Sequence, residues 1–190
     1  MRRIIATFPA VLLIGCAPKT SVSSPVPVAP PIAPAPSTPV SISVQARATL
    51  NDLTGNRVGT VDFTDTPGGL LVTGTVSGLG LGAHGVHLHA VGKCEPPFTT
   101  AGGHFNPTSA KHGFRNPDGH HMGDMPNIVT PAAGQLGFQF VVAGVRLNGN
   151  GGLLDADGAA IVIHATADDY MTDPSGNSGS RLACGVIVAR

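Results

Sequence analysis

The sequence predicts an all-β fold, a sandwich or a barrel, over residues 41–190. Glycine is abundant, at 26 of the 190 residues, and Gly-rich turns separate short apolar runs. The first of these runs alternates apolar and polar side chains, as a half-buried strand does. No helical period of comparable length appears between the runs, and short strands without intervening helices form sandwiches and barrels.

The strands follow one another closely along the chain. The first, at 43–50, places Val44, Ala46, Ala48 and Leu50 on one face and polar residues on the other. Turn-forming residues at 51–56 and 66–69 separate the first three strands. The remaining strands are expected at 57–64, 69–77, 85–90, 136–142, 161–164 and 182–188.

Two long irregular stretches, 91–135 and 165–181, interrupt the strand pattern. Long loops in compact domains are usually functional or disordered. Because these two carry several candidate metal ligands, we interpret them as functional loops.

The N-terminus carries features of an export signal. Two arginines precede the apolar stretch 4–14, which is too short to span a membrane, so residues 1–15 are interpreted as a secretory signal peptide. Leu13-Ile14-Gly15-Cys16 resembles a bacterial lipobox, in which the cysteine is lipidated and becomes the mature N-terminus. The alternative is an ordinary signal peptide with an incidental cysteine. We expect an exported protein on the periplasmic side, anchored to the membrane through Cys16, and Ala17 favours the outer membrane.

Residues 16–40 join this anchor to the domain. After Cys16 the segment consists of Pro, Ser, Val, Ala, Ile and Thr with one lysine, a composition that excludes a helix or a central strand. We interpret it as a semi-extended tether.

The two remaining cysteines and the charge balance bound the function further. Cys94 and Cys184 are an even pair, which in an exported protein predicts a disulfide; two buried free thiols are the alternative. The formal net charge is +0, and nothing indicates a basic surface for nucleic acid.

Six histidines and one carboxylate are the candidate metal ligands. They are too many for one tetrahedral zinc and suit two adjacent metals that share a ligand. Imidazole-rich sites favour copper and zinc, so a mixed pair is expected. The candidates are His87, His89, His104, His112, His121, Asp124 and His164.

The spacing of these residues indicates how they divide. Residues two apart in a strand face the same side, so His87 and His89 can reach one ion, although paired histidines also occur by chance. His164 adds a third nitrogen if its strand lies beside theirs. In the first long loop, His112, His121 and Asp124 lack one ligand for a closed site. His104 could complete it and bind the copper through its other nitrogen, if it is deprotonated.

These motifs together resemble the copper,zinc superoxide dismutases, specifically the bacterial exported branch, over about residues 41–190. The matching segments are Gly85-Val86-His87-Leu88-His89, Gly103-His104-Phe105-Asn106-Pro107, Lys111-His112-Gly113, His121-Met122-Gly123-Asp124-Met125-Pro126-Asn127, Ile163-His164-Ala165 and Gly179-Ser180-Arg181-Leu182-Ala183-Cys184-Gly185, together with Cys94.

The resemblance implies a fold, an activity and a role for each residue. The fold is an eight-stranded Greek-key β-barrel, an immunoglobulin-like sandwich. The activity is dismutation of superoxide to dioxygen and hydrogen peroxide by a copper redox centre, bridged through His104 to a structural zinc. The resemblance implies that copper is bound by His87, His89, His104 and His164, and zinc by His104, His112, His121 and Asp124. It further implies that Arg181 is the active-site arginine and that Asp168 links a copper histidine to a zinc histidine. Cys94 and Cys184 would form the disulfide.

The chain departs from the family pattern at the second loop. Residues 165–181 contain three aspartates and no lysine, where family members often place lysines that attract the anion; Lys93 and Lys111 could substitute. His84 is expected to brace backbone and His120 to lie exposed. The alternative function is a non-catalytic copper- and zinc-binding module on the same barrel, although all seven ligand positions are filled. Monomer and homodimer both remain open.

Overall fold

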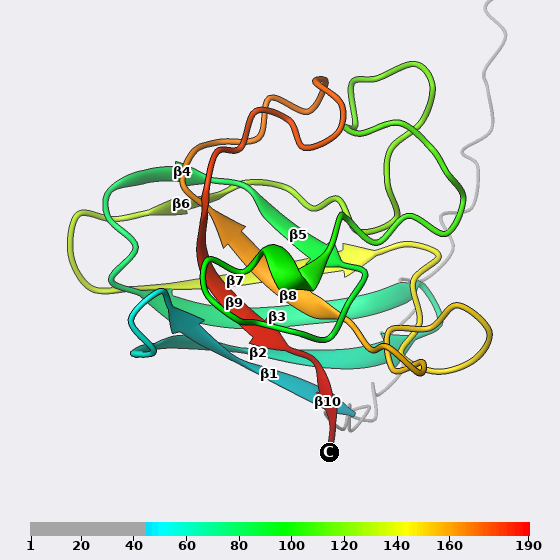
Figure 1. The fold of residues 1–190 in the computed structure, drawn as a ribbon, viewed down its shortest axis with the longest axis horizontal. Coiled ribbons are helices and arrows are strands. Elements are labelled where there is room, and N and C mark those ends of the chain that lie inside the picture. Colours follow the sequence, from blue (N-terminus) through cyan, green and yellow to red (C-terminus); the bar gives the residue numbers. More distant parts are fainter. Residues whose placement is uncertain (1–44) are drawn as a thin grey trace, which may run out of the picture. The chain divides into compact units, whose positions relative to one another are not determined.

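The computed structural model describes residues 45–190; the predicted signal peptide, Cys16 and the tether lie outside this range. Its strands are β1 (Ala46–Asp52), β2 (Arg57–Thr66), β3 (Gly69–Ser77), β4 (Gly82–His84), β5 (Val86–His89), β6 (Ile128–Thr130), β7 (Gln135–Val142), β8 (Ala160–His164), β9 (Arg181–Val186) and β10 (Val188–Ala189), with one 3₁₀ turn, η1 (Thr99–Ala101) (Figure 1). Within residues 45–190 no helix is long and apolar enough to cross a membrane.

One curled antiparallel sheet of eight strands forms the body of the domain. Its order is β5-β8-β9-β1-β2-β3-β7, with β10 beside β1, while β4 and β6 form a separate pair. Strands far apart in sequence are neighbours, because β3 pairs with β7, β1 with β9, and β5 with β8. These crossovers are those of a Greek key, so the predicted all-β, Greek-key fold is confirmed.

All seven predicted strands appear, with differences at the ends. The expected final strand at 182–188 is interrupted at Ile187, whose N–H donates to the carbonyl of Ala159 instead of the sheet. The short strands β4 and β6 were not predicted, and β6 lies inside the stretch expected to be irregular. Each has three residues, too few for a period-two pattern to stand out.

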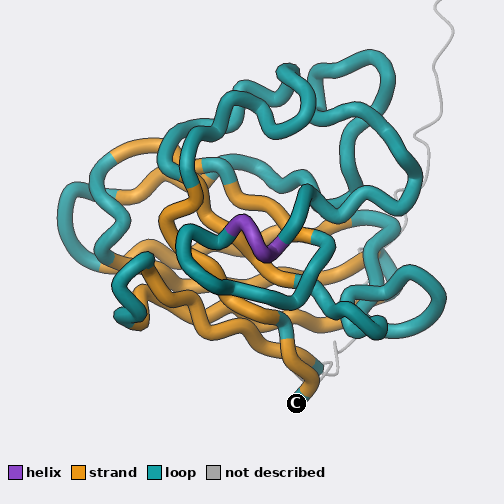
Figure 2. The backbone as a smooth tube through the Cα atoms, viewed as in Figure 1, coloured by secondary structure: helices purple, strands orange, loops and turns teal. Residues whose placement is uncertain are grey.

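The two faces of β5 and β8 have different surroundings. Val86 and Leu88 of β5 point into the main hydrophobic core, together with Ile161 and Ile163 of β8. Their other face carries the histidines of β5 and a smaller apolar cluster, which includes Val162. Figure 2 shows the long loops gathered on one side of the strands. The histidines of β5 therefore lie between the sheet and these loops.

Candidate metal centre

The long first loop folds back along the free edge of β5. Leu88 N–H donates to the carbonyl of Gly123 at 2.9 Å, and Phe105 N–H donates to the carbonyl of Leu88 at 2.8 Å. Gly123 is required here because a Cβ would lie 2.5 Å from the Leu88 oxygen. This pairing places His104 opposite His89 and Asp124 opposite His87.

Four histidines form the first ligand group, His87, His89, His104 and His164, whose ligand atoms all lie within 4.8 Å of one another. His164 reaches the group because β8 pairs with β5, and Val162 lies opposite His87 in the register. Each of the four rings has one buried nitrogen without a hydrogen-bond partner: His87 Nδ1 and the Nε2 atoms of the other three. Buried polar atoms are normally paired, so four unpartnered ring nitrogens that converge on one point fit a metal cation as their common partner.

The opposite nitrogens orient three of these rings. His87 Nε2 donates to Asp168 Oδ2 at 2.8 Å, and His89 Nδ1 donates to the carbonyl of Gly102 at 3.0 Å. His164 Nδ1 donates to the carbonyl of Gly179 at 3.4 Å. A carboxylate or carbonyl oxygen only accepts, so the facing nitrogen carries the hydrogen and the other keeps its lone pair for a metal.

The second group contains His104, His112, His121 and Asp124, again within 4.8 Å of one another. Asp124 Oδ1 lies 2.9 Å from His104 Nδ1 and 3.1 Å from His112 Nδ1. His121 Nδ1 lies 3.2 Å from His104 Nδ1. Three imidazoles and one carboxylate match a closed tetrahedral zinc site. His104 belongs to both groups, with Nδ1 in the second and Nε2 in the first.

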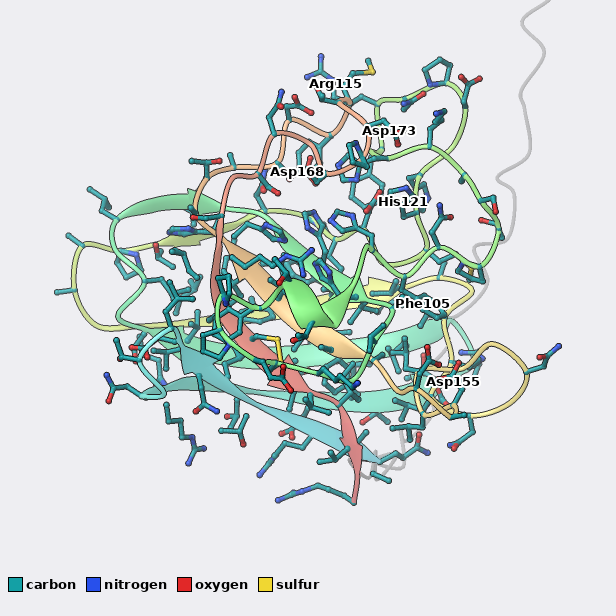
Figure 3. The ribbon with its side chains drawn as sticks, viewed as in Figure 1. Phe105, Arg115, His121, Asp155, Asp168 and Asp173 are labelled. Atoms are coloured by element: carbon teal, nitrogen blue, oxygen red, sulfur yellow. A yellow bond between two sulfur atoms is a disulfide. The ribbon has the colours of Figure 1, made fainter. Side chains whose placement is uncertain are left out.

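Asp168 connects the two groups from outside. Its Oδ2 accepts the His87 hydrogen bond and its Oδ1 accepts one from His112 Nε2 at 3.0 Å. The carboxylate is buried, and Figure 3 shows Asp168 on the same side of the sheet as His121. One residue therefore orients a ligand of each group.

Burial and hydrogen bonding shift the pKa values of the site in opposite directions. Burial lowers the pKa of His87 to about 4 and that of His164 to about 3, so both rings are neutral near pH 7. Burial also acts on His112, but hydrogen bonds to Asp124 and Asp168 outweigh it and raise the pKa of His112 to about 9. Against burial, which would raise it, hydrogen bonds from the imidazoles hold the pKa of Asp124 well below its usual range.

A cavity of about 400 Å³ opens onto the shared histidine. It is lined by Gly103, His104, Asn106, His121, His164, Pro174, Ser175, Gly179 and Arg181. The Arg181 guanidinium donates to the carbonyls of Phe98 at 2.6 Å and Gly102 at 2.7 Å. Arg181 therefore places a fixed cation on the wall of this cavity.

The predicted disulfide is present between Cys94 and Cys184. It joins β9, which carries Arg181, to the segment that leads to η1. The carbonyl of Phe98 that accepts from Arg181 lies four residues after Cys94. The bond therefore tethers the segment that holds the arginine in place.

The structure also places the two histidines that were not expected to bind metal, and one of the lysines considered for anion attraction. His84 is buried and bonds the carbonyl of His164 at 2.8 Å, so it braces backbone as expected. His120 is exposed, also as expected. Lys111, one of two lysines considered for anion attraction, lies 3.2 Å from Asp173 and is paired with it.

Some positions that shape the site were not predicted. The carbonyls of Gly102 and Gly179 orient two candidate copper ligands, and Asn127 and Tyr170 hold Asp168. A main-chain carbonyl that accepts a hydrogen bond cannot be recognised from the type of residue that carries it. The only available signal was Asn127, which closes the segment that begins at His121.

Comparison with known proteins agrees with this geometry. The family model described as copper/zinc superoxide dismutase matches residues 57–187. The chain is 42% identical over 151 residues to superoxide dismutase [Cu-Zn] 2 of Aquifex aeolicus, covering 77% of this chain and 88% of the relative. It is 43% identical over 138 residues to superoxide dismutase [Cu-Zn] of Caulobacter vibrioides, covering 70% and 79%.

A solved structure shares the fold. A double mutant of a SOD-like protein from Bacillus subtilis superimposes with a TM-score of 0.71 at 40% identity, covering 74% of this chain and 95% of that one. The family model covers most of the chain, and the two curated relatives are 42% and 43% identical to it. The chain therefore belongs to the copper/zinc superoxide dismutase family.

Proposed function

We propose that this protein converts two superoxide ions and two protons into dioxygen and hydrogen peroxide. The observation that carries the proposal is the pair of ligand groups that share His104. The unpartnered ring nitrogens of the first group and the imidazole–carboxylate set of the second suit copper and zinc respectively.

The residues would divide between the metals as follows. Copper would be held by His87, His89, His104 and His164, and zinc by His104, His112, His121 and Asp124. Copper supplies one-electron redox chemistry when bound, and zinc supplies none. His104 Nε2 belongs to a residue that lines the cavity, so it is placed to hold a proton and deliver it to product there.

Arg181 would bind and orient the anion. Its guanidinium lines the same cavity, and two carbonyls fix its direction. A guanidinium remains charged at any physiological pH and offers several donors in fixed geometry. It therefore attracts superoxide without contributing a ligand to either metal.

Metal analysis beside a kinetic assay tests the function. The full chain is expected to hold one copper and one zinc and to consume superoxide at a rate that depends on copper. A chain that binds both metals in this ratio without consuming superoxide would instead be the non-catalytic binding module.

We also propose that the protein is exported and lipid-anchored on the periplasmic side, with the outer membrane favoured. The support is sequence alone: the apolar stretch 4–14, the lipobox ending at Cys16 and the tether at 16–40. Cys16→Ser should abolish lipid attachment while leaving the activity of the domain unchanged. Mass spectrometry of the native protein that shows an unmodified Cys16 would contradict the anchor.

The oligomeric state is proposed separately. We expect either a monomer or a homodimer, and the mass of the purified protein in solution separates the two.

A further inference from the structure

Tyr170 has a backbone conformation that calls for an explanation. It lies two residues after Asp168, with φ at 61°, in the left-handed region. A bulky residue is strained there and stays only where surrounding contacts hold it. The contacts of Tyr170 therefore indicate what this part of the loop is built to do.

On one side, Tyr170 contacts the carboxylate that connects the two ligand groups. Its N–H donates to Asp168 Oδ1 at 2.6 Å. The same oxygen accepts the hydrogen bond from His112 Nε2 at 3.0 Å. The main chain of Tyr170 thus fixes the oxygen that orients a candidate zinc ligand.

On the other side, Tyr170 is tied to the first long loop. Its carbonyl accepts from Arg115 N–H at 2.9 Å, and its ring lies 5.7 Å from the ring of Phe114. Gly113 passes so close that a Cβ there would lie 2.6 Å from the nitrogen of Met171. These contacts come directly after His112 and join the two loops beside it (Figure 3, where Arg115 is labelled).

The phenol oxygen closes a ring of hydrogen bonds around Asp168. It accepts the N–H of Asn127 at 2.7 Å. The Asn127 side chain in turn accepts from Asp168 N–H at 2.8 Å and donates to the Asp168 carbonyl at 2.9 Å. Removing the phenol oxygen would leave a half-buried Asn127 N–H without its acceptor.

We propose that Tyr170 is a positioning residue that locks Asp168 between the two metal sites. Tyr170 joins the loop of Asp168 to the loop of His112 and Asp124, so it stabilises the candidate zinc site. Because Asp168 also accepts a hydrogen bond from His87, Tyr170 helps to keep the two ligand groups aligned. The inference rests on the proposed assignment of the two metals. Its specific element is the phenol oxygen, since the ring alone would serve packing.

Zinc retention in the copper- and zinc-loaded full chain tests the proposal. Tyr170→Phe keeps the ring and backbone and removes only the acceptor for Asn127. A zinc-binding chelator is expected to remove zinc from this variant at about tenfold lower concentration than from the parent. Tenfold is the lower end of the loss of metal affinity seen when a residue that hydrogen-bonds a metal ligand is replaced. Met171→Leu, at the exposed neighbouring position, is the matched control and should behave as the parent.

The tyrosine itself gives a second readout. The chain has one tyrosine and no tryptophan, so tyrosine fluorescence of the parent reports on Tyr170 alone. We expect the parent emission to change at the chelator concentration that releases zinc. Tyr170→Phe contains no tyrosine and supplies only the background signal.

Two results would overturn the positioning role in a parent that binds zinc. One is a chelator concentration for zinc removal from Tyr170→Phe that lies within twofold of the parent value. The other is a parent emission that does not change when zinc is released. A parent chain that binds no zinc at all would overturn the proposed function, and this inference with it, so the two failures are distinguishable.

Discussion

His87, His89 and His164 each commit one ring nitrogen to the protein and leave the other free. The committed nitrogen faces an oxygen that can only accept, so each ring has one tautomer and one direction. This arrangement fixes the lone pairs before a metal arrives. The free nitrogens then converge within the 4.8 Å that defines the first group.

At this scale, His89→Ala is expected to remove copper and activity while keeping zinc and the fold. His89 belongs to the first group alone, and the core face of β5 is untouched. His120→Ala, at an exposed histidine outside both groups, is the control and should keep both metals. Copper analysis with a superoxide assay checks this, and full activity in a copper-free His89→Ala preparation would refute the assignment.

Arg181→Ala is expected to lower kcat/KM by about tenfold, within the range that electrostatic steering supplies. Superoxide dismutase operates near the diffusional ceiling, so capture of the anion should limit the rate. Metal content should stay constant, and added salt should slow the parent more than the variant because screening acts on the same attraction. Kinetics at two ionic strengths measures both effects.

Arg181→Lys refines this test. Lysine keeps the charge but lacks the fork that reaches both the Phe98 and Gly102 carbonyls. An intermediate rate is expected. If Arg181→Ala were as fast as the parent, or equally sensitive to salt, the arginine would not be the anion guide.

At the scale of elements, the site is made by loops packed against a strand edge. The first long loop pairs with β5 through main-chain hydrogen bonds, and the second crosses over Asp168 at Gly176. A Cβ at Gly176 would overlap the Asp168 carboxylate and lie 2.6 Å from His112 Nε2. The close approach of this loop is therefore part of how Asp168 is held.

Gly176→Ala is expected to weaken zinc binding by about tenfold to a hundredfold, as loss of an outer partner does. Gly158→Ala is the matched control, because φ is 66° there and 62° at Gly176, so alanine is similarly strained at both. At Gly158 the nearest atom would be 3.4 Å from the new Cβ, so only stability should fall, by about 1 kcal/mol for a side chain in the left-handed region. Zinc competition and thermal melting separate the two; equal zinc affinity in both variants would contradict the close-approach argument.

At the scale of the whole molecule, buried imidazoles make the metal-free fold sensitive to pH. The native pKa values of His87 and His164, about 4 and about 3, lie below the ordinary value of 6.5. Below pH 6.5 the unfolded chain therefore binds more protons, and stability falls as pH is lowered towards these values. The slope is about 1.4 kcal/mol per pH unit for each proton taken up.

His112 acts with the opposite sign. Its native pKa, about 9, lies above 6.5, so its contribution is present below 6.5 and is lost as pH rises through 9. Stability of the metal-free chain should therefore be greatest near pH 6.5 and lower at pH 4.5 and at pH 9. Urea unfolding at these pH values measures the curve, and a flat profile would show that the rings are not buried in the native state.

The sequence by itself determined the chemistry of this protein and the faces of its longer strands. Alternation is a property of consecutive residues, so it predicted that His87 and His89 share a side opposite Val86 and Leu88, as the structure shows. The types of ligand and their number indicated two metals. Motif resemblance then indicated the family and the pairing of Cys94 with Cys184, which the structure contains.

The tertiary structure alone decided which main-chain groups and outer residues complete the site. The carbonyls of Gly102 and Gly179 meet their histidines only after the loops fold over β5 and β8. Tyr170 and Asn127 are 43 residues apart in sequence and meet because two loops cross beside Asp168. Such contacts depend on chain crossings rather than on any local period. A carbonyl is the same in every residue, so no sequence pattern marks the carbonyls of Gly102 and Gly179.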